Sequence, residues 1–151
     1  MGARSGHDYI ERLAATRPSV HIHGEAVSGP IPEHPVFGRL VKSYAALYDM
    51  QLEPERRELM TYEAPGSGER VGTSFIVPRS PEDLVRRREM MKAWADFSLG
   101  TLGRTGDYLN CCVMALSEAQ PWFAAADPAF AANIAAYYER VSSRSSLLTR
   151  S

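Results

Sequence analysis

Apolar residues recur every three or four positions along most of the chain, a spacing that predicts amphipathic helices. The first helix is expected to start after Ser5, where Asp8 stands as a capping-box acid, and to end before Pro18. Asp127-Pro128 marks the start of the last helix. The helices predicted in this way cover residues 6–17, 36–48, 81–99, 106–119 and 128–141, with a short helical turn at 54–59.

The clearest local signal is Ser80-Pro81-Glu82-Asp83. Serine suits the N-cap, proline suits the first helical position, and the two acids complement the exposed amides and the positive end of the helix dipole. This signal predicts a long helix through Trp94 that ends at Gly100. The run 86–88 within it consists of three arginines, and we interpret it as a solvated face because the chain has no basic excess.

Short strands are predicted in two places. Residues 20–27 alternate around Gly24 and indicate a hairpin, and 60–62 and 71–77 indicate two strands joined by a Pro-Gly-Ser-Gly turn. The fold class predicted from these patterns is mainly α with small β-hairpins. Residues 142–151 include five serines, a composition that favours a disordered tail over a packed helix. We therefore divide the chain into a helical domain at 1–141 and a tail at 142–151.

Composition excludes several classes of protein. A chain of 151 residues fits one domain with a core, and its net charge of −1 argues against nucleic-acid binding. No apolar run approaches the roughly 18 residues of a membrane span, and no signal peptide is recognisable. Cys111 and Cys112 are adjacent on a predicted helix, so they are poorly placed to pair and are expected to be small buried or half-buried residues. These features favour a cytoplasmic protein without membrane or nucleic-acid partners.

Most motifs with possible chemistry have a plainer explanation. His21 and His23 would share one face of a predicted strand, but no third ligand is suggested by spacing, so we expect no metal site there. The glycines of 66–68 lack the strand, helix and Lys-Ser/Thr of a phosphate-binding loop. We regard that segment as a turn.

Arg104 and Tyr108 form the one candidate pair. They stand four residues apart at the start of a predicted helix, where anions are favoured. Arginine there could hold a phenolate or carboxylate, and tyrosine could donate a hydrogen bond to it. Spacing alone leaves the alternative of a surface arginine and a core tyrosine, and favours it.

The sequence around this pair resembles that of the 4-hydroxyphenylacetate 3-hydroxylase family. Members of this family are the oxygenase components of two-component, flavin-dependent aromatic monooxygenases. The likeness extends in unbroken order over about residues 5–141. Its main motifs are Arg70-Val71-Gly72-Thr73-Ser74-Phe75-Ile76-Val77-Pro78-Arg79, Glu82-Asp83-Leu84-Val85-Arg86-Arg87-Arg88, Trp94-Ala95 and Gly103-Arg104-Thr105-Gly106-Asp107-Tyr108-Leu109-Asn110.

The resemblance implies an N-terminal helical domain of an acyl-CoA dehydrogenase-like fold, followed in the family by a β-barrel and a helical bundle that forms a homotetramer. It implies hydroxylation of a phenol, such as 4-hydroxyphenylacetate, ortho to its hydroxyl group. Reduced FAD would come from a separate flavin reductase. An enzyme of this kind must favour the phenolate form of its substrate and exclude water.

The resemblance also implies roles for individual residues. Arg104 and Tyr108 would be both substrate-binding and catalytic, with Arg104 stabilising negative charge on the phenolic oxygen and Tyr108 orienting it. The family's third partner is a histidine in a Leu-Thr-His motif, and the counterpart here is Leu148-Thr149-Arg150. The flavin-binding residues lie further along in the family, so none can be assigned on this chain. We therefore expect a fragment that is inactive alone.

Two alternatives remain. One is a non-enzymatic, degenerate helical fragment that binds related subunits. The other is a relative of the 4-hydroxybutyryl-CoA dehydratases, which share this N-terminal domain. Those enzymes take their iron–sulfur ligands from later segments, so Cys111 and Cys112 give them no support.

Overall fold

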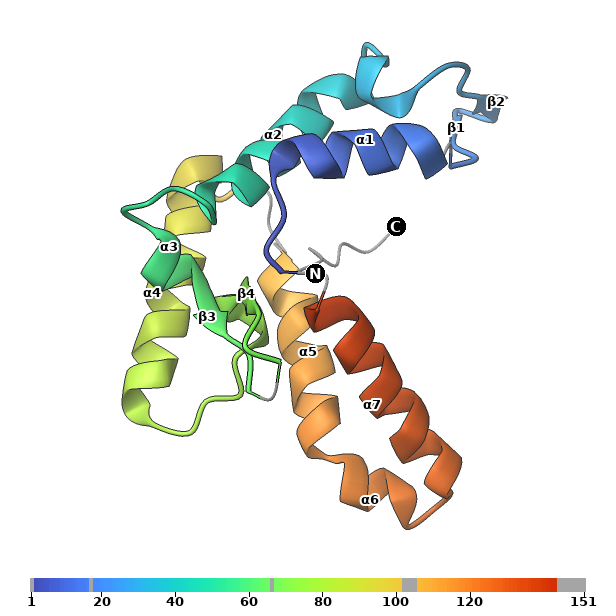
Figure 1. Cartoon of the computed structure of the whole chain (residues 1–151). Helices are drawn as coiled ribbons and strands as arrows, with labels where there is room; N and C mark the ends of the chain where they lie inside the picture. The colour runs from blue at the N-terminus through green and yellow to red at the C-terminus, as the bar shows by residue number, and fades with distance from the viewer. Residues whose placement is uncertain (1, 17, 66, 102–105, 144–151) are drawn as a thin grey trace.

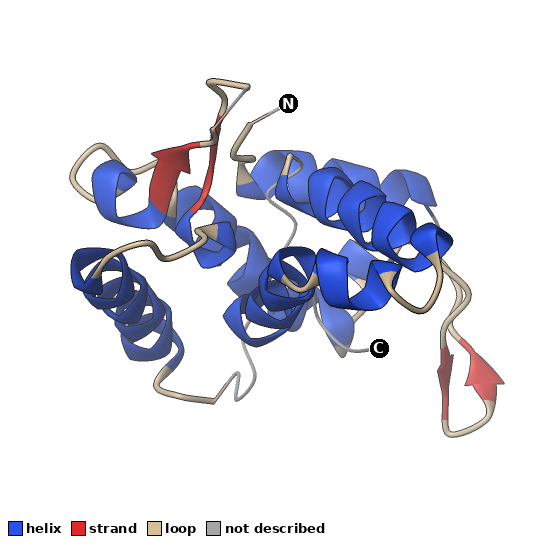
Figure 2. Cartoon of the chain, turned by 90° about the horizontal axis from the view of Figure 1, so that it is seen from below, coloured by secondary structure: helices blue, strands red, loops and turns tan. Residues whose placement is uncertain are grey.

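The computed structural model describes residues 2–16, 18–65, 67–101 and 106–143. Helices dominate the described residues, and two short antiparallel hairpins lie in different parts of the molecule (Figures 1 and 2). The mainly helical class predicted from the sequence is confirmed. The elements are α1 (Gly6–Thr16), β1 (His21–Ile22), β2 (Glu25–Ala26), η1 (Ile31–Glu33), α2 (Phe37–Met50), α3 (Arg57–Met60), β3 (Thr61–Glu63), β4 (Arg70–Gly72), η2 (Thr73–Phe75), α4 (Pro81–Ser98), α5 (Gly106–Glu118), α6 (Gln120–Ala124) and α7 (Pro128–Ser142).

Side-chain caps start the helices where the sequence predicts them. The Ser80 hydroxyl accepts from the amide of Asp83, whose carboxylate accepts from the Ser80 amide, so α4 begins with a complete capping box. Ser5 and Asp8 form the same reciprocal pair at α1. Asp127 accepts from the amide of Ala129 at the start of α7.

The hairpins are shorter than predicted. His21 pairs with Ala26 in the first, and Tyr62 pairs with Val71 in the second. The predicted strand over 71–77 ends at Gly72, and Thr73–Phe75 forms the 3₁₀ turn η2 instead. The prediction was wrong here because tertiary contacts of these residues outweigh their β propensity.

The α1 helix packs on α2 through a close backbone approach (Figure 1). The Gly6 amide donates to the Asp49 carboxylate at 2.7 Å, and the rings of Tyr9 and Tyr48 stack at 5.1 Å. A Cβ atom on Gly6 would lie 2.4 Å from the carbonyl oxygen of Ala45. Only glycine therefore fits at this position without moving α1.

The main core joins α2, α3 and α4. Its buried members are Leu47, Met50, Met60, Met90 and Trp94. Trp94 is 1% exposed, although its indole N–H has no hydrogen-bond partner. Trp94 is the largest side chain of this cluster, so its burial removes more apolar surface from water than that of any other member.

The helices α5, α6 and α7 form the other end of the molecule (Figure 1). Between the two helices predicted at 106–119 and 128–141 the structure has the additional short helix α6, with Pro121 in its first turn. Below α6 the chain reverses, and α7 runs back beside α5.

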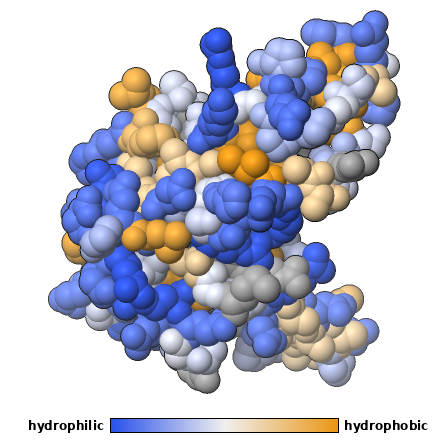
Figure 3. All heavy atoms as spheres, turned by 45° about the horizontal axis from the view of Figure 1, so that its top comes forward, coloured by the Kyte–Doolittle hydropathy of each residue, from blue (hydrophilic) through white to orange (hydrophobic). Residues whose placement is uncertain are grey.

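Many large apolar side chains reach the surface, as the scattered hydrophobic patches in Figure 3 show. On α4 the buried side is formed by Arg87, Met90 and Trp94, and the neighbouring side exposes Leu84 and Met91. Other exposed apolar side chains are Val36, Leu40, Leu52, Val85, Phe97, Leu99, Leu116, Trp122, Phe130 and Tyr137. Within the described residues, no helix is long and apolar enough to cross a membrane.

The two tryptophans provide a matched test of this core. Replacing Trp94, which is 1% exposed, with alanine should lower the free energy of unfolding by about 3–5 kcal/mol because it leaves a cavity. Trp122→Ala, at a side chain that is 74% exposed, should cost less than about 1 kcal/mol. Urea unfolding followed by circular dichroism measures both values, and equal losses would contradict the assignment of the core.

Candidate functional site

The predicted pair of site residues is only half described. Arg104 lies outside the described residues. Tyr108 is the third residue of α5 and is 51% exposed. It is therefore at the surface of this chain and not in its core, contrary to the alternative that spacing alone favours.

The buried side of α5 faces away from Tyr108. Asn110, Met114 and Ser117 are buried at spacings of four and three residues, which place them on one side of the helix. Tyr108 and Cys112 are exposed and share the opposite side. The cysteines are free, and the expectation of burial was wrong for Cys112, while Cys111 is half-buried.

Asn110 connects α5 to η2 inside the protein. Its side chain is 0% exposed, and Nδ2 donates to Oγ of Ser74 at 2.8 Å. Ser74 is itself 2% exposed, so the hydrogen bond is shielded from water. The Oδ1 atom of Asn110 is buried without a hydrogen-bond partner.

Arg87 and Thr73 anchor η2 to other helices. Arg87, only 7% exposed, donates to the carbonyl oxygen of Ser74 at 3.4 Å, and Oγ1 of Thr73 donates to the carbonyl oxygen of Leu59 at 2.7 Å. The prediction of a solvated arginine face was therefore wrong for Arg87. Arg87 is buried because it contacts Ser74, a residue of η2 that packs against α4. A pattern of charges along the sequence does not reveal this contact.

Two tyrosines complete the attachment of η2. The hydroxyl groups of Tyr62 and Tyr138 both donate to the carbonyl oxygen of Phe75, at 3.3 and 2.8 Å. Burial, which opposes ionisation, is the main cause that raises the pKa of each phenol above its ordinary value. Both tyrosines line a cavity of about 430 Å³ between the β3–β4 hairpin and the end of α7.

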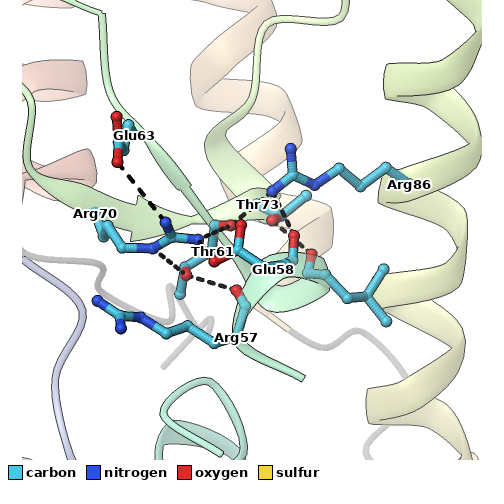
Figure 4. Close-up of polar contacts among 8 residues, drawn as sticks. Arg57, Glu58, Thr61, Glu63, Arg70, Thr73 and Arg86 are labelled. Atoms are coloured by element: carbon cyan, nitrogen blue, oxygen red, sulfur yellow. Dashed lines mark hydrogen bonds and ion pairs between the residues drawn. The ribbon is translucent and has the colours of Figure 1, made fainter. Parts of the chain in front are cut away.

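A cluster of charged residues holds the β3–β4 hairpin against α3 and α4 (Figure 4). Arg70 pairs with Glu58 at 2.7 Å, and its Nε donates to the hydroxyl of Thr61 at 3.1 Å. Arg86 reaches across from α4 and donates to the carbonyl oxygens of Glu58 and Thr61. Arg86 is thus also a structural residue, whereas Arg88 is exposed and pairs with its neighbour Glu89.

The described residues show no metal centre. His21 lies in β1, and His23 lies in the turn after it at a φ of 52°, so the two do not share a strand face as predicted. Nowhere in the described part do three or more His, Cys, Asp or Glu side chains come close enough together to hold a metal ion.

Comparison with known proteins identifies the family. The profile of the 4-hydroxyphenylacetate 3-hydroxylase N-terminal domain matches residues 5–151. The chain belongs to this family. The match includes the serine-rich residues 142–151, so the division into 1–141 and 142–151 stays a prediction.

Relatives in the 4-hydroxyphenylacetate 3-hydroxylase family are much longer. The oxygenase components of 4-hydroxyphenylacetate 3-monooxygenase from Geobacillus sp. (strain PA-9) and Thermus thermophilus are 46% and 45% identical over 139 and 136 residues. These alignments cover 92% and 90% of this chain, but only 28% and 27% of the relatives. The chain thus spans under a third of the length of these relatives.

Solved structures agree with the family. The crystal structure of an oxygenase component complexed with FAD and 4-hydroxyphenylacetate is 44% identical, with a TM-score of 0.84 over 93% of this chain and 28% of that one. A 4-hydroxybutyryl-CoA dehydratase from N. maritimus is 23% identical, with a TM-score of 0.73 over 93% of this chain and 27% of that chain. The second likeness shows a shared fold alone.

The raised pKa values of Tyr62 and Tyr138 predict a loss of stability at high pH. The folded state retains two phenolic protons that the unfolded chain releases above pH 10, so stability is complete below pH 10 and falls as pH rises further. In the Tyr62→Phe/Tyr138→Phe variant the unfolding free energy should depend less steeply on pH between 10 and 12. At pH 7 the variant should lose about 1–3 kcal/mol with its two hydrogen bonds. Urea unfolding across this range measures both effects.

The exposed Tyr137 provides the control for that experiment. Tyr137→Phe removes a phenol hydroxyl from a side chain that is 47% exposed and should cost less than about 1 kcal/mol at pH 7. An unchanged slope in the Tyr62→Phe/Tyr138→Phe variant would contradict the assignment.

Proposed function

We propose that the chain provides the substrate side of a phenol hydroxylase that depends on reduced FAD. Membership of the hydroxylase family carries the proposal, and the exposed position of Tyr108 at the start of α5 supports it. The substrate class is a phenol similar to 4-hydroxyphenylacetate, the compound in the complex of the 44% identical oxygenase component.

In this proposal Arg104 and Tyr108 bind the phenolic oxygen. The guanidinium of Arg104 favours the phenolate by placing positive charge beside it. The Tyr108 hydroxyl donates a hydrogen bond that orients the ring for attack at the ortho carbon. The family's histidine is replaced by Arg150 in the Leu-Thr-Arg sequence, so these two residues carry the recognition that this chain can offer.

The described residues do not fit FAD. The cavity beside Tyr62 and Tyr138 is lined by Glu69 and Glu139, whose carboxylates would repel a pyrophosphate. A smaller cavity of about 330 Å³ is lined by Arg57 and Arg70, but Glu69 also lines it and Arg70 is already paired with Glu58. Bound flavin would supply activated oxygen. We assign its binding residues to parts of the proposed enzyme other than the described residues.

The remaining features of the proposal concern partners and location. By analogy with the family, a separate reductase supplies the reduced flavin, the complete oxygenase is a homotetramer, and the enzyme works in the cytoplasm. The alternative of a non-enzymatic subunit-interaction module draws support from the exposed apolar side chains of α4 and α7. Hydroxylation by an enzyme that contains this domain distinguishes the two functions.

A domain exchange tests the proposed function. Residues 5–141 would replace the matching segment of the Thermus thermophilus oxygenase component, and reduced FAD, dioxygen and 4-hydroxyphenylacetate would be supplied. We expect catechol formation, and Tyr108→Phe should lower kcat/KM by about 10-fold or more, since hydrogen bonds to charged groups contribute about 1.5–3 kcal/mol. Tyr137→Phe is the matched control.

The outcomes separate the two functions. A folded chimera without activity, or one in which Tyr108→Phe and Tyr137→Phe behave alike, would refute the proposed roles. The 151-residue chain alone should form no catechol above a control without protein, because its described residues form no flavin site.

A further inference from the structure

We propose that Asn110 is the positioning residue of the phenol site. Its hydrogen bond to Ser74 fixes the rotation of α5 about its own axis, and this rotation turns Tyr108 outward. The inference rests on the proposed function of Tyr108 and adds to it a residue that touches neither substrate nor flavin.

The helix geometry couples the two side chains. Successive residues of an α-helix are about 100° apart, so side chains two positions apart point in nearly opposite directions. Asn110 is 0% exposed and Tyr108 is 51% exposed, as this geometry requires. Any rotation of α5 that brings Asn110 to the surface turns Tyr108 toward the protein.

Hydrogen bonding makes Asn110 a specific anchor. A buried amide that loses its hydrogen-bond partner leaves an unsatisfied donor in the core, and a hydrogen bond weakens steeply when its angle departs from the preferred range. The 2.8 Å bond from Nδ2 to Ser74 Oγ therefore selects one rotation of α5. The amide's other polar atom, Oδ1, has no partner, so this bond carries the whole polar attachment of the side chain.

The acceptor of this bond is itself held in place. Arg87 from α4 donates a hydrogen bond to the backbone oxygen of Ser74. On either side of Ser74, the Thr73 hydroxyl donates to the carbonyl oxygen of Leu59, and the carbonyl oxygen of Phe75 accepts from the Tyr138 hydroxyl. Ser74 thus presents its hydroxyl at a fixed point of the core.

Among the residues of α5 whose burial is described, Met114 and Ser117 are the other buried ones, and neither sets the rotation of the helix in this way. Met114 contributes packing, which has no donor–acceptor direction. The Ser117 hydroxyl donates to the carbonyl oxygen of Met114 in the same helix. Asn110 is therefore the member of the buried stripe whose described hydrogen bond leads to another element.

The relative accessibility of Cys111 and Cys112 reports the rotation of α5 about its axis. Cys112 is exposed and Cys111 is half-buried, and the two lie about 100° apart. Brief alkylation of the full 151-residue chain with iodoacetamide, read by mass spectrometry, gives the ratio of labelling at Cys112 to that at Cys111. In the unchanged protein we expect Cys112 to be labelled at least 5-fold faster.

Asn110→Leu and Ser74→Ala should each reduce this ratio at least 3-fold, because each removes the bond from one side. Met114→Ala is the matched control: it removes packing from the same stripe and lowers the unfolding temperature but should leave the ratio within 1.5-fold. The Asn110→Leu/Ser74→Ala variant should change the ratio no more than Asn110→Leu does.

Each outcome decides the inference. A ratio that stays constant in Asn110→Leu and Ser74→Ala, or that falls equally in Met114→Ala, would overturn it. If Asn110→Leu does not fold, Ser74→Ala provides the same test from the η2 side. The measurement needs no substrate, so a failure of the domain-exchange experiment and a failure of this inference remain distinguishable.

Discussion

The backbone of the 3₁₀ turn Thr73–Phe75 is the constraint on which the central part of the structure depends. Buried carbonyl groups must find hydrogen-bond donors, and here the donors come from different elements: Arg87 on α4 and Tyr138 on α7. The side chains of Thr73 and Ser74 extend the same connection to α3 and α5. One short turn thus fixes the relative positions of four helices.

Local signals in the sequence predict the helix starts that depend on neighbouring residues alone. Ser80 and Asp127 mark helix starts because a cap involves only neighbouring residues. Thr73–Phe75 was mistaken for a strand because its conformation depends on partners up to 63 residues away, as for Tyr138. Arg87 was assigned to solvent for the same reason: its burial is decided by Ser74, which lies on a different element.

The candidate site shows the same division between local and distant information. Spacing placed Tyr108 near a helix start, and family motifs suggested its role, but spacing could not say which side of α5 faces the core. That choice depends on Asn110, a residue that sequence reasoning included only as part of a motif. No sequence signal distinguishes Asn110, because the side of α5 that it shares with Met114 and Ser117 holds a second polar residue and its burial follows only from the structure.

Several helices carry apolar residues on more than one side. This explains why apolar periodicity does not identify the buried side, and why apolar side chains are exposed on the surface of the domain. On α4, Met90 and Trp94 face the described core while Leu84 and Met91 face outward, so periodicity alone cannot select the inner side. On α5, Tyr108 and Leu116 are exposed on the sides not occupied by Asn110. Helices with a second apolar side are typical of domains that pack against further protein, and relatives in this family are more than three times as long. In the proposed enzyme, the rotation of α5 would therefore determine which of its side chains meet the substrate and which meet the rest of the oxygenase.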